Sequence, residues 1–373
     1  DEHSYHLGNE IKGLAYSPDG SQLISVAGEI VVAVDSDDFS SSNFSFFAGS
    51  EIGSLDYAPS GEQFALGTAG GQILLRDASN GARQDNFEAH DETVMTLSYT
   101  ADGLYLVSGG ADAIVKVWDL ETLETVATET ESAFYDIEDV VCSDDGSYIL
   151  VVPYPSGSSQ LKPEPFLRDA PDLGNTAANR DYQYDSNGDR IVYVARAGAV
   201  SPGGAAYTVT VGDDDKVMLW DTTTRHQIEI FSGHTDDIRA VDFSPDGTKV
   251  LTGSYDEDAI VWDLSSFITT YDLTTSGVEV VPASTTFLEN VEVRLTPEIV
   301  DGMAFVGWTG DVPSGSETDI PLSVTMDQDR EITPVYVADD TDTDEDGLTD
   351  QSEIYTYRTD PNNADSDDDG LSD

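Results

Sequence analysis

The stretch SGGADAIVKVWD (108–119) decides the fold, and it returns in altered form as TGSYDEDAIVWD (252–263). Each copy begins with a hydroxyl residue, places an Asp four residues later, and ends in Trp-Asp after an apolar run. The branched residues of that run are typical of a β-strand. A strand of this kind ending in Asp is predicted at six places: IVVAVD (30–35), ILLRD (73–77), IVKVWD (114–119), FLRD (166–169), VMLWD (217–221) and IVWD (260–263).

A four-residue turn signal precedes each of these strands by about sixteen residues. It reads SPDG (17–20), APSG (58–61), TADG (100–103), SDDG (143–146), SPGG (201–204) and SPDG (244–247). Pro fixes φ, Asp or Ser can bond back to the backbone, and Gly accepts positive φ, so a tight turn is predicted. Short alternating strands such as GLAYS and AVDFS stand before the turns. The chain therefore holds six units of about 42 residues, each with several strands.

Six such units over residues 1–265 resemble the WD-repeat family of β-propellers. The resemblance implies an all-β propeller whose face holds a protein or peptide. Six blades are visible, whereas seven is the commonest number in that family. Two explanations stay open: an upstream blade is absent from this sequence, or SYHL (4–7) supplies the closing strand.

The resemblance also implies a buried hydrogen-bond chain inside the third and sixth blades. It would join His90, Ser108, Asp112 and Trp118 in one blade, and His234, Thr252, Asp256 and Trp262 in the other. These sets also match the residue types of a Ser-His-Asp catalytic triad. We favour architecture, because a nucleophile needs an exposed position and an oxyanion hole. Blade five keeps Thr210, Asp214 and Trp220 but has no His at the expected place, and blades one, two and four lack the Trp.

The repeat spacing widens between the fourth and fifth units, around residues 153–190. This stretch is rich in Pro, Gly, Asn and Asp, so it is predicted to form surface loops. Its aromatic residues, Tyr154, Phe166, Tyr182 and Tyr184, either form a recognition patch or belong to an unconstrained insertion.

Residues 266–338 lose the blade pattern. The segment 291–337 resembles the B-type repeat of internalin-like bacterial surface proteins, with the pattern F-x-G-W-x-G-D followed by M-x-x-D. The matching residues are Phe305, Gly307, Trp308, Gly310, Asp311, Met326, Asp329, Ile332, Val335 and Tyr336. The resemblance implies a compact β-rich module. Trp308 is expected to cap a small core rather than to act as a binding platform.

The acidic tail 339–373 repeats DTDEDGLTD (342–350) as DSDDDGLSD (365–373). The first copy satisfies the calcium-loop spacing D-x-D-x-D-G-x5-E, in which alternate carboxylates turn to one centre and Gly permits the bend. The predicted Ca²⁺ ligands are Asp342, Asp344, Asp346, Leu348 (through its carbonyl), Asp350 and Glu353, then Asp365, Asp367, Asp369 and Asp373. No helical period flanks the loop, so the pattern resembles thrombospondin type 3 calcium repeats, here truncated. The alternative is a solvated acidic linker.

The composition limits the classes of partner that the protein can bind. The net charge is −57, from 73 acids against 16 bases, which argues against nucleic acid or an anionic membrane as partner. No run of 18 apolar residues and no signal peptide is visible. The single cysteine, Cys142, excludes an internal disulfide framework and reads as a small strand residue.

We therefore expect a non-catalytic binding segment of a secreted or cell-surface bacterial protein, with a propeller for a protein partner and a calcium-stiffened stalk. One alternative is a multidomain secreted enzyme whose catalytic domain lies outside this chain. Another is a cytoplasmic WD scaffold in a salt-accumulating cell. The calcium pattern favours the extracellular setting.

Overall fold

The computed structural model describes most of the chain and divides it into two compact units. The described residues are 11–35, 42–131, 135–155, 165–171, 173, 183–184, 190–191, 195–204, 206–222, 224, 226–300, 303–338, 347–349, 359 and 363. Unit 1 comprises Asp1–Phe243 and Val250–Trp262, and unit 2 comprises Ser244–Lys249 and Asp263–Asp373. Among the described residues, we find no helix with the length and hydropathy needed to span a membrane. The expected boundaries at residues 265 and 338 stay predictions.

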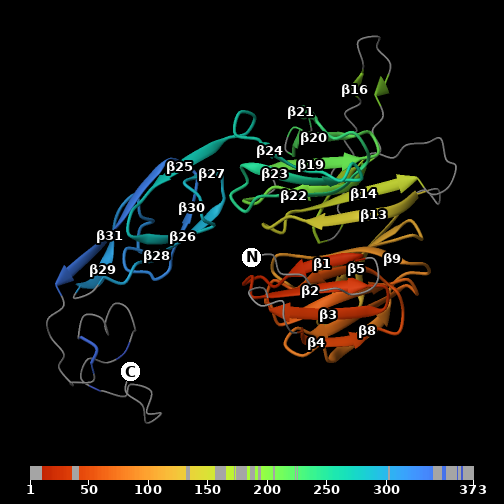
Figure 1. The fold of residues 1–373 in the computed structure, drawn as a ribbon, viewed down its shortest axis with the longest axis horizontal. Helices are drawn as coiled ribbons and strands as arrows, with labels where there is room; N and C mark the ends of the chain where they lie inside the picture. The colour runs from red at the N-terminus through yellow and green to blue at the C-terminus, as the bar shows by residue number, and fades with distance from the viewer. Residues whose placement is uncertain are drawn as a thin grey trace. The chain divides into compact units, whose positions relative to one another are not determined.

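Unit 1 is built from six small antiparallel sheets, one per repeat (Figure 1). Blades one to three have four strands each: β1 (Gly13–Tyr16), β2 (Gln22–Ala27), β3 (Ile30–Asp35) and β4 (Ser42–Phe47); β5 (Ile52–Tyr57), β6 (Gln63–Thr68), β7 (Gln72–Asp77) and β8 (Arg83–Glu88); β9 (Val94–Tyr99), β10 (Tyr105–Gly110), β11 (Ile114–Asp119) and β12 (Thr125–Thr130). In each sheet the strands pair in chain order. This arrangement is that of a WD-type propeller, as the sequence predicted.

Blades four to six vary this plan. Blade four has β13 (Tyr135–Cys142), β14 (Tyr148–Pro155) and β15 (Phe166–Asp169); blade five has β18 (Ala195–Val200), β19 (Tyr207–Gly212), β20 (Lys216–Asp221) and β21 (Gln227–Ser232); blade six has β22 (Ile238–Phe243), β23 (Lys249–Ser254) and β24 (Ala259–Asp263). A separate hairpin joins β16 (Gln183–Tyr184) to β17 (Arg190–Ile191). The strand predicted at FLRD (166–169) is confirmed as β15. The prediction of surface loops over 153–190 is wrong where β14 extends to Pro155 and where β16 pairs with β17.

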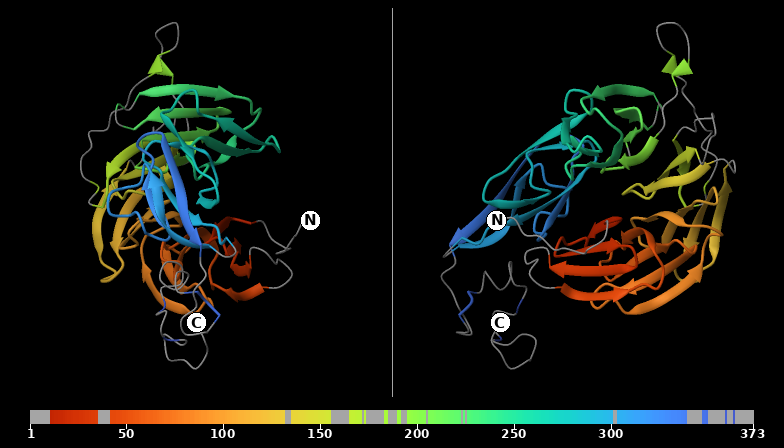
Figure 2. Two further views of the ribbon diagram at one scale, coloured as in Figure 1. Left: turned by 90° about the vertical axis from the view of Figure 1, so that its left-hand side faces the viewer. Right: turned by 45° about the vertical axis from the view of Figure 1, so that its right-hand side comes forward.

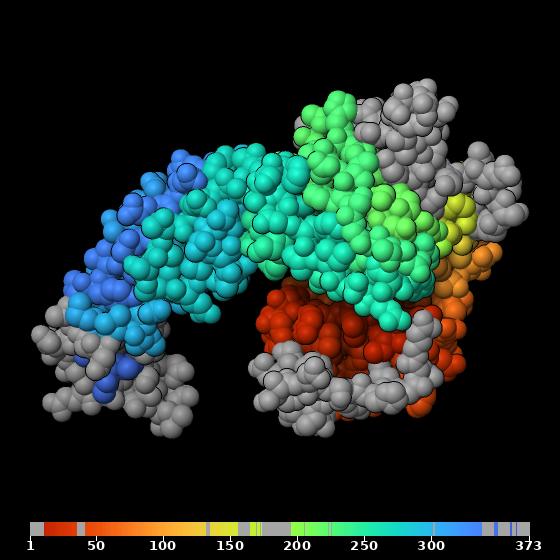
Figure 3. Space-filling model, turned by 45° about the horizontal axis from the view of Figure 1, so that its top comes forward, coloured from red at the N-terminus to blue at the C-terminus, as the bar shows by residue number. Residues whose placement is uncertain are grey.

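The innermost strands of consecutive blades lie next to one another. β1 contacts β5, β5 contacts β9, β9 contacts β13, β13 contacts β18, and β18 contacts β22. The blades follow one another along an arc from red to green in Figure 2. In Figure 3 blade one forms the red surface of the unit, and blades five and six form its green surface.

The predicted turns connect the first and second strands of every blade. The closing glycine of all six tetrapeptides has positive φ, between 67° and 98°. In the first turn the Gly20 amide donates to the Ser17 carbonyl at 2.8 Å, and the Ser21 amide donates to the Asp19 carboxylate at 3.0 Å. The Asx-type bonding and the glycine conformation explain why this tetrapeptide recurs.

The core of unit 1 lies between blades rather than within them. Tyr57 and Phe64 of blade two pack with Ile24 and Val26 of blade one in a single cluster. The same kind of cluster joins blades two and three, and blades three and four. Blades two, three and four thus each bury one face of their sheet against the blade before and the other face against the blade after, which removes apolar surface from water.

Unit 2 contains two sheets, drawn in teal and blue in Figure 1. One sheet pairs β27 (Thr286–Leu288), β25 (Thr270–Thr274), β31 (Arg330–Ala338) and β29 (Met303–Gly310), and the other pairs β26 (Val278–Val281), β28 (Glu292–Pro297) and β30 (Leu322–Thr325). Trp308 is buried, and its indole N–H donates to the Asp319 carbonyl at 2.7 Å. This burial agrees with the expected core role of Trp308. A Cβ at Gly310 would lie on the Glu331 carbonyl oxygen, so the F-x-G-W-x-G-D pattern has a steric basis.

Candidate functional site

A buried hydrogen-bond chain crosses blade three, as predicted. The Trp118 indole N–H donates to Ser108 Oγ at 2.9 Å, and Ser108 Oγ lies 2.8 Å from His90 Nε2. His90 Nδ1 lies 2.9 Å from the Asp112 carboxylate. Burial lowers the pKa of His90, so the ring is neutral at pH 7. The arrangement assigns a neutral ring that donates from Nδ1 and accepts at Nε2, which satisfies every member of the chain.

Blade six repeats this chain with Thr in place of Ser. Trp262 donates to Thr252 Oγ1 at 2.9 Å, Thr252 Oγ1 lies 2.8 Å from His234 Nε2, and His234 Nδ1 lies 2.9 Å from Asp256. Burial by itself raises the pKa of Asp256. Three hydrogen bonds, from the Thr235 amide, the Asp258 amide and His234, outweigh burial and lower this pKa to about 2. The Asp therefore ties the loop that precedes the first strand to the turn that follows the second.

These chains do not present a nucleophile to a substrate. Ser108 is 0% exposed and Thr252 is 1% exposed, and each hydroxyl also accepts the bond of a Trp indole. A nucleophile must reach substrate and face an oxyanion hole. The geometry therefore supports the architectural interpretation over the catalytic one.

In blade five the buried hydrogen-bond chain lacks its His. Trp220 still donates to Thr210 Oγ1 at 2.9 Å. However, Asp214 Oδ2 is buried and has no hydrogen-bond partner, and burial raises the pKa of Asp214. An unsatisfied buried acceptor costs free energy. Blade five therefore has an unpaired buried carboxylate oxygen where blades three and six have an Asp that is bonded to His.

A second group of residues stands at five matching β-bulges, one at the start of each innermost strand in blades two to six. The register shift leaves one residue unpaired in each strand: Gly53, Met95, Glu138, Arg196 and Arg239. A bulge re-aims a side chain away from the regular ladder. The three charged ones belong to blades four, five and six.

The Arg196 guanidinium is held by three neighbouring residues. Its Nε donates to Asp213 at 2.8 Å, its Nη1 donates to Glu138 at 3.2 Å, and its plane stacks 3.2 Å from the centroid of the Tyr154 ring. The Tyr154 hydroxyl donates to the same Asp213 at 2.8 Å. Burial by itself raises the pKa of Asp213, but the hydrogen bonds from Arg196 and Tyr154 outweigh burial and lower this pKa. Charge-assisted bonds of this kind fix a guanidinium in one orientation.

Arg239 lies beside this group and is less completely paired. It forms ion pairs with Asp237 and, at 3.4 Å, with Asp213, and it stacks 4.6 Å from the Tyr255 ring. Its Nε is buried and has no hydrogen-bond partner, while Tyr255 is 65% exposed. The cluster thus presents an open aromatic ring, backed by a guanidinium whose Nε is buried.

We call these residues the arginine–tyrosine cluster: Glu138, Tyr154, Arg196, Asp213, Arg239 and Tyr255. Equivalent positions hold Gly53, Ala69, Met95 and Ala111 in blades two and three, and Lys12 and Gly28 in blade one. Tyr154 was among the residues singled out from the sequence, whereas the two arginines were not. The sequence did contain a signal for the two arginines. They are basic residues at the same repeat position of adjacent units, in a chain whose net charge is −57.

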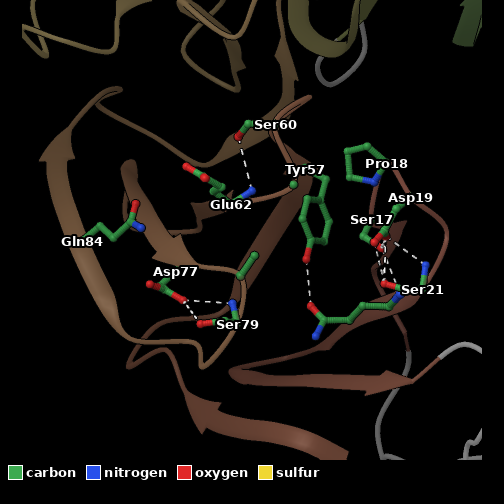
Figure 4. Close-up of a pocket in the computed structure, with 13 residues that line it drawn as sticks. Ser17, Pro18, Asp19, Ser21, Tyr57, Ser60, Glu62, Asp77, Ser79 and Gln84 are labelled. Atoms are coloured by element: carbon green, nitrogen blue, oxygen red, sulfur yellow. Dashed lines mark hydrogen bonds between the residues drawn. The ribbon is translucent and has the colours of Figure 1, made fainter. Parts of the chain in front are cut away.

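A cavity of about 550 Å³ lies between blades one and two, near the first two turns (Figure 4). Its acids are held by neighbouring groups: Asp19 accepts from the Ser17 and Ser21 hydroxyls, and Asp77 accepts from Ser79. The Ser17 hydroxyl, with Ser21, lowers the pKa of Asp19 to about 2, and the Ser79 hydroxyl lowers the pKa of Asp77. Such acids stay ionised at neutral pH and do not serve as general acids.

The predicted calcium ligands lie outside the described residues, except Leu348. Gly347, the sixth position of the first loop, has φ of 106°, a conformation that favours glycine and fits the sharp bend of the pattern. Among the described residues, no group of three His, Cys, Asp or Glu side chains is placed to hold a metal. The calcium loops therefore stay a prediction.

Comparison with known proteins bears on the propeller. The family model "WD domain, G-beta repeat" matches residues 81–119 and 225–263, which end at the two Trp-Asp strands of blades three and six. Similar proteins include WD repeat-containing protein 1 of Xenopus tropicalis, 25% identical over 57% of this chain and 41% of that protein. Protein groucho of Drosophila melanogaster is 27% identical over 49% of this chain and 23% of its own length.

A third similar protein is the serine-threonine kinase receptor-associated protein of Mus musculus, 25% identical over 47% of this chain and 56% of its length. The chain spans less than two thirds of each of these three relatives. These matches show that the chain carries WD repeats, and they agree with the six blades and the buried hydrogen-bond chains.

Proposed function

We propose that the WD-repeat domain is a non-catalytic scaffold that binds a protein partner through the arginine–tyrosine cluster. The observation that carries this proposal is the Tyr255 ring, which is 65% exposed and stacks 4.6 Å from the Arg239 guanidinium. Arg and Tyr dominate the energetics of protein interfaces because they combine large contact area with directed hydrogen bonds.

The cluster is held in shape before any partner arrives. Arg196 is fixed by Asp213, Glu138 and the Tyr154 ring, and the backbone beneath it is a β-sheet. A side chain that is already ordered loses little entropy on binding.

Charge defines the kind of partner. A net charge of −57 attracts a basic partner at long range and repels an acidic one. At short range the exposed Tyr255 ring offers apolar contact area and a hydroxyl. The proposed partner is therefore a basic protein segment that lays an aromatic or aliphatic group on Tyr255.

Peptides selected from a random display library against the full chain test this proposal. Binding of the selected peptides is measured by fluorescence anisotropy on wild type, Tyr255→Ala, Arg239→Ala and the control Phe47→Ala, an exposed residue of blade one. We expect at least tenfold weaker binding to both cluster variants and no change for the control. Selected peptides that bind all four proteins equally would place the docking site elsewhere.

For the acidic tail we propose Ca²⁺ loops that stiffen an extracellular or cell-surface stalk. The spacing of Asp342, Asp344, Asp346 and Glu353, the φ of Gly347, and the need to neutralise 73 acids support this proposal. The bacterial origin rests on resemblance alone, since the three relatives named above are animal proteins.

Isothermal calorimetry of Ca²⁺ into the full chain tests the loops. The Asp344→Ala and Asp367→Ala variants should each lose part of the heat, while Glu121→Ala, an exposed acid of blade three, should match wild type. If saturable heat is absent in wild type at millimolar Ca²⁺, or is unchanged in both loop variants, the tail is a solvated linker.

A further inference from the structure

The outermost strand of blade one, β4, differs from the outermost described strands of the other blades because it carries no charge. Its sequence is SNFSFF (42–47). Each of the other outermost strands contains at least one ionisable residue: Glu88 in β8, Glu129 in β12, Arg168 in β15, Glu229 in β21 and Asp263 in β24. Charged side chains on an edge strand are a common protection against pairing with another chain. β4 lacks that protection in a chain whose net charge is −57.

The edge of β4 does not depend on what precedes blade one. In blades two, three and five the fourth strand is also the last strand of its sheet, although each of these blades follows another blade. A blade placed before blade one would therefore cover a face of its sheet and leave the edge of β4 as it is. Phe47 is 77% exposed, and the residues at the same repeat position of blades two and three, Glu88 and Thr130, are exposed as well.

Two residues of β4 direct their backbone N–H and C=O groups away from the sheet. The Ala48 amide donates to the Glu29 carbonyl at 2.8 Å, at one end of a β3–β4 register that is unbroken as far as Phe44. Bonded and non-bonded pairs alternate along an antiparallel ladder, so every second residue before Ala48 bonds to β3. Ser45 and Phe47 are the residues between. Among the described residues no strand pairs with β4 on its outer side, so these backbone groups face a free edge.

Side chains on the inner face of β4 already hold this edge in place. Phe44 packs in the cluster that joins blades one and two, with its ring 6.2 Å from that of Phe64. Phe46 stacks 6.3 Å from Phe44, and the Arg76 guanidinium lies 4.8 Å from the centroid of the Phe46 ring. An edge that is ordered before pairing loses little entropy when a strand is added to it.

We propose that β4 of one copy of this chain pairs with β4 of a second copy as an antiparallel strand. The register that uses the outward groups of both copies sets Ser45 of one opposite Phe47 of the other, and it brings the two Phe46 side chains opposite one another. Aromatic pairs across neighbouring strands stabilise a sheet. The contact joins one surface to itself, so it closes at a dimer.

Charge favours a second copy at this edge over the other outer edges. In the same register, β12 would set Glu129 of one copy opposite Glu129 of the other, and β8 and β21 would bring Glu88 and Glu229 to the contact. Like charges that face each other across strands destabilise the pair. At β4 only the long-range repulsion between two chains of net charge −57 remains, so association should strengthen as salt screens it. The proposal does not depend on the arginine–tyrosine cluster, which involves other residues.

Sedimentation velocity of the full chain tests the proposal, in dilute salt and in about 1 M NaCl, where the screening length falls to ~3 Å. Ser45→Pro removes an outward N–H and leaves the β3–β4 bonds in place. Ser45→Glu instead places a charge at the contact. Thr128→Pro and Thr128→Glu are the matched controls, because Thr128 holds the same repeat position on β12 and is exposed. Circular dichroism confirms folding, and the Glu variants decide the outcome if a Pro variant does not fold.

We expect wild type and the Thr128 variants to form dimers in high salt, and the Ser45 variants to have a dimer dissociation constant raised by about tenfold or more, because each copy loses an interchain hydrogen bond or gains a repelling charge. Site-resolved hydrogen exchange should show slower exchange of the Ser45 and Phe47 amides in the dimer than in dilute, monomeric protein. Wild type that stays monomeric in high salt, assemblies larger than a dimer, a dimer unchanged by Ser45→Glu, or a dimer that leaves both amides unprotected would each overturn the proposal.

Discussion

Replacing Thr252 by Val should destabilise the protein more than replacing Thr210 by Val. The two positions are closely matched: both threonines are buried, at 1% and 2% exposure, and each accepts a Trp indole bond of 2.9 Å. Val has nearly the shape of Thr, so the substitution removes the hydroxyl without opening a cavity. The difference is that Thr252 Oγ1 also lies 2.8 Å from His234 Nε2, whereas Thr210 has no His.

The expected magnitudes follow from the number of groups left without a partner. An unsatisfied buried polar group costs about 1–3 kcal/mol. Thr210→Val leaves the Trp220 N–H alone, so we expect a loss of ~1–2 kcal/mol. Thr252→Val leaves both the Trp262 N–H and His234 Nε2 alone, so we expect a loss of ~2–4 kcal/mol.

Urea unfolding followed by tryptophan fluorescence and circular dichroism measures this difference. His234→Ala combined with Thr252→Val completes the comparison, because the double variant should cost less than the sum of the single ones. An equal loss for Thr252→Val and Thr210→Val would refute the view that the His bond contributes to blade stability.

Four further predictions follow from other parts of the structure. Asp112→Asn should destabilise the protein, because Asp112 accepts hydrogen bonds from His90 and from the Asp91 amide. Asp214→Asn should be neutral or stabilising, because Asp214 Oδ2 has no partner. Urea midpoints at neutral pH compare the two variants. Burial raises the pKa of Asp139 from 3.8 to about 7. The contribution of Asp139 to stability is therefore present below about pH 4 and is lost as the pH rises to 7. Urea midpoints between pH 5 and 7 should decline less in Asp139→Asn than in wild type. Burial lowers the pKa of His90, so the contribution of His90 to stability is present above pH 6.5 and is lost as the pH falls below that value. Between pH 7 and pH 5, His90→Phe should lose less stability than wild type. Trp308→Phe should lower the stability of unit 2 by ~1–2 kcal/mol because the Asp319 carbonyl loses its donor, and hydrogen exchange of β29 and β31 amides reports the change.

The repeat, its strands and its turns were determined by local sequence. Gly at the end of each tetrapeptide and the apolar runs that end in Asp predict strand and turn from neighbouring residues alone, and the structure confirms them. The buried chains of blades three and six agree with what the WD-repeat resemblance implied. Within 153–190 the Pro and Gly content indicated loops, but β14 runs on to Pro155 because it pairs with Tyr135–Ile137 of β13, a pairing that local sequence does not show.

The candidate site was decided by tertiary structure. Arg196 and Arg239 are 43 residues apart, and only the bulges at the start of β18 and β22 bring both to Asp213. Whether a strand end is core or surface also depends on its neighbours. Tyr16, Tyr57 and Tyr99 occupy the same repeat position, yet only Tyr16 is exposed, because burial of a blade requires another blade beside it.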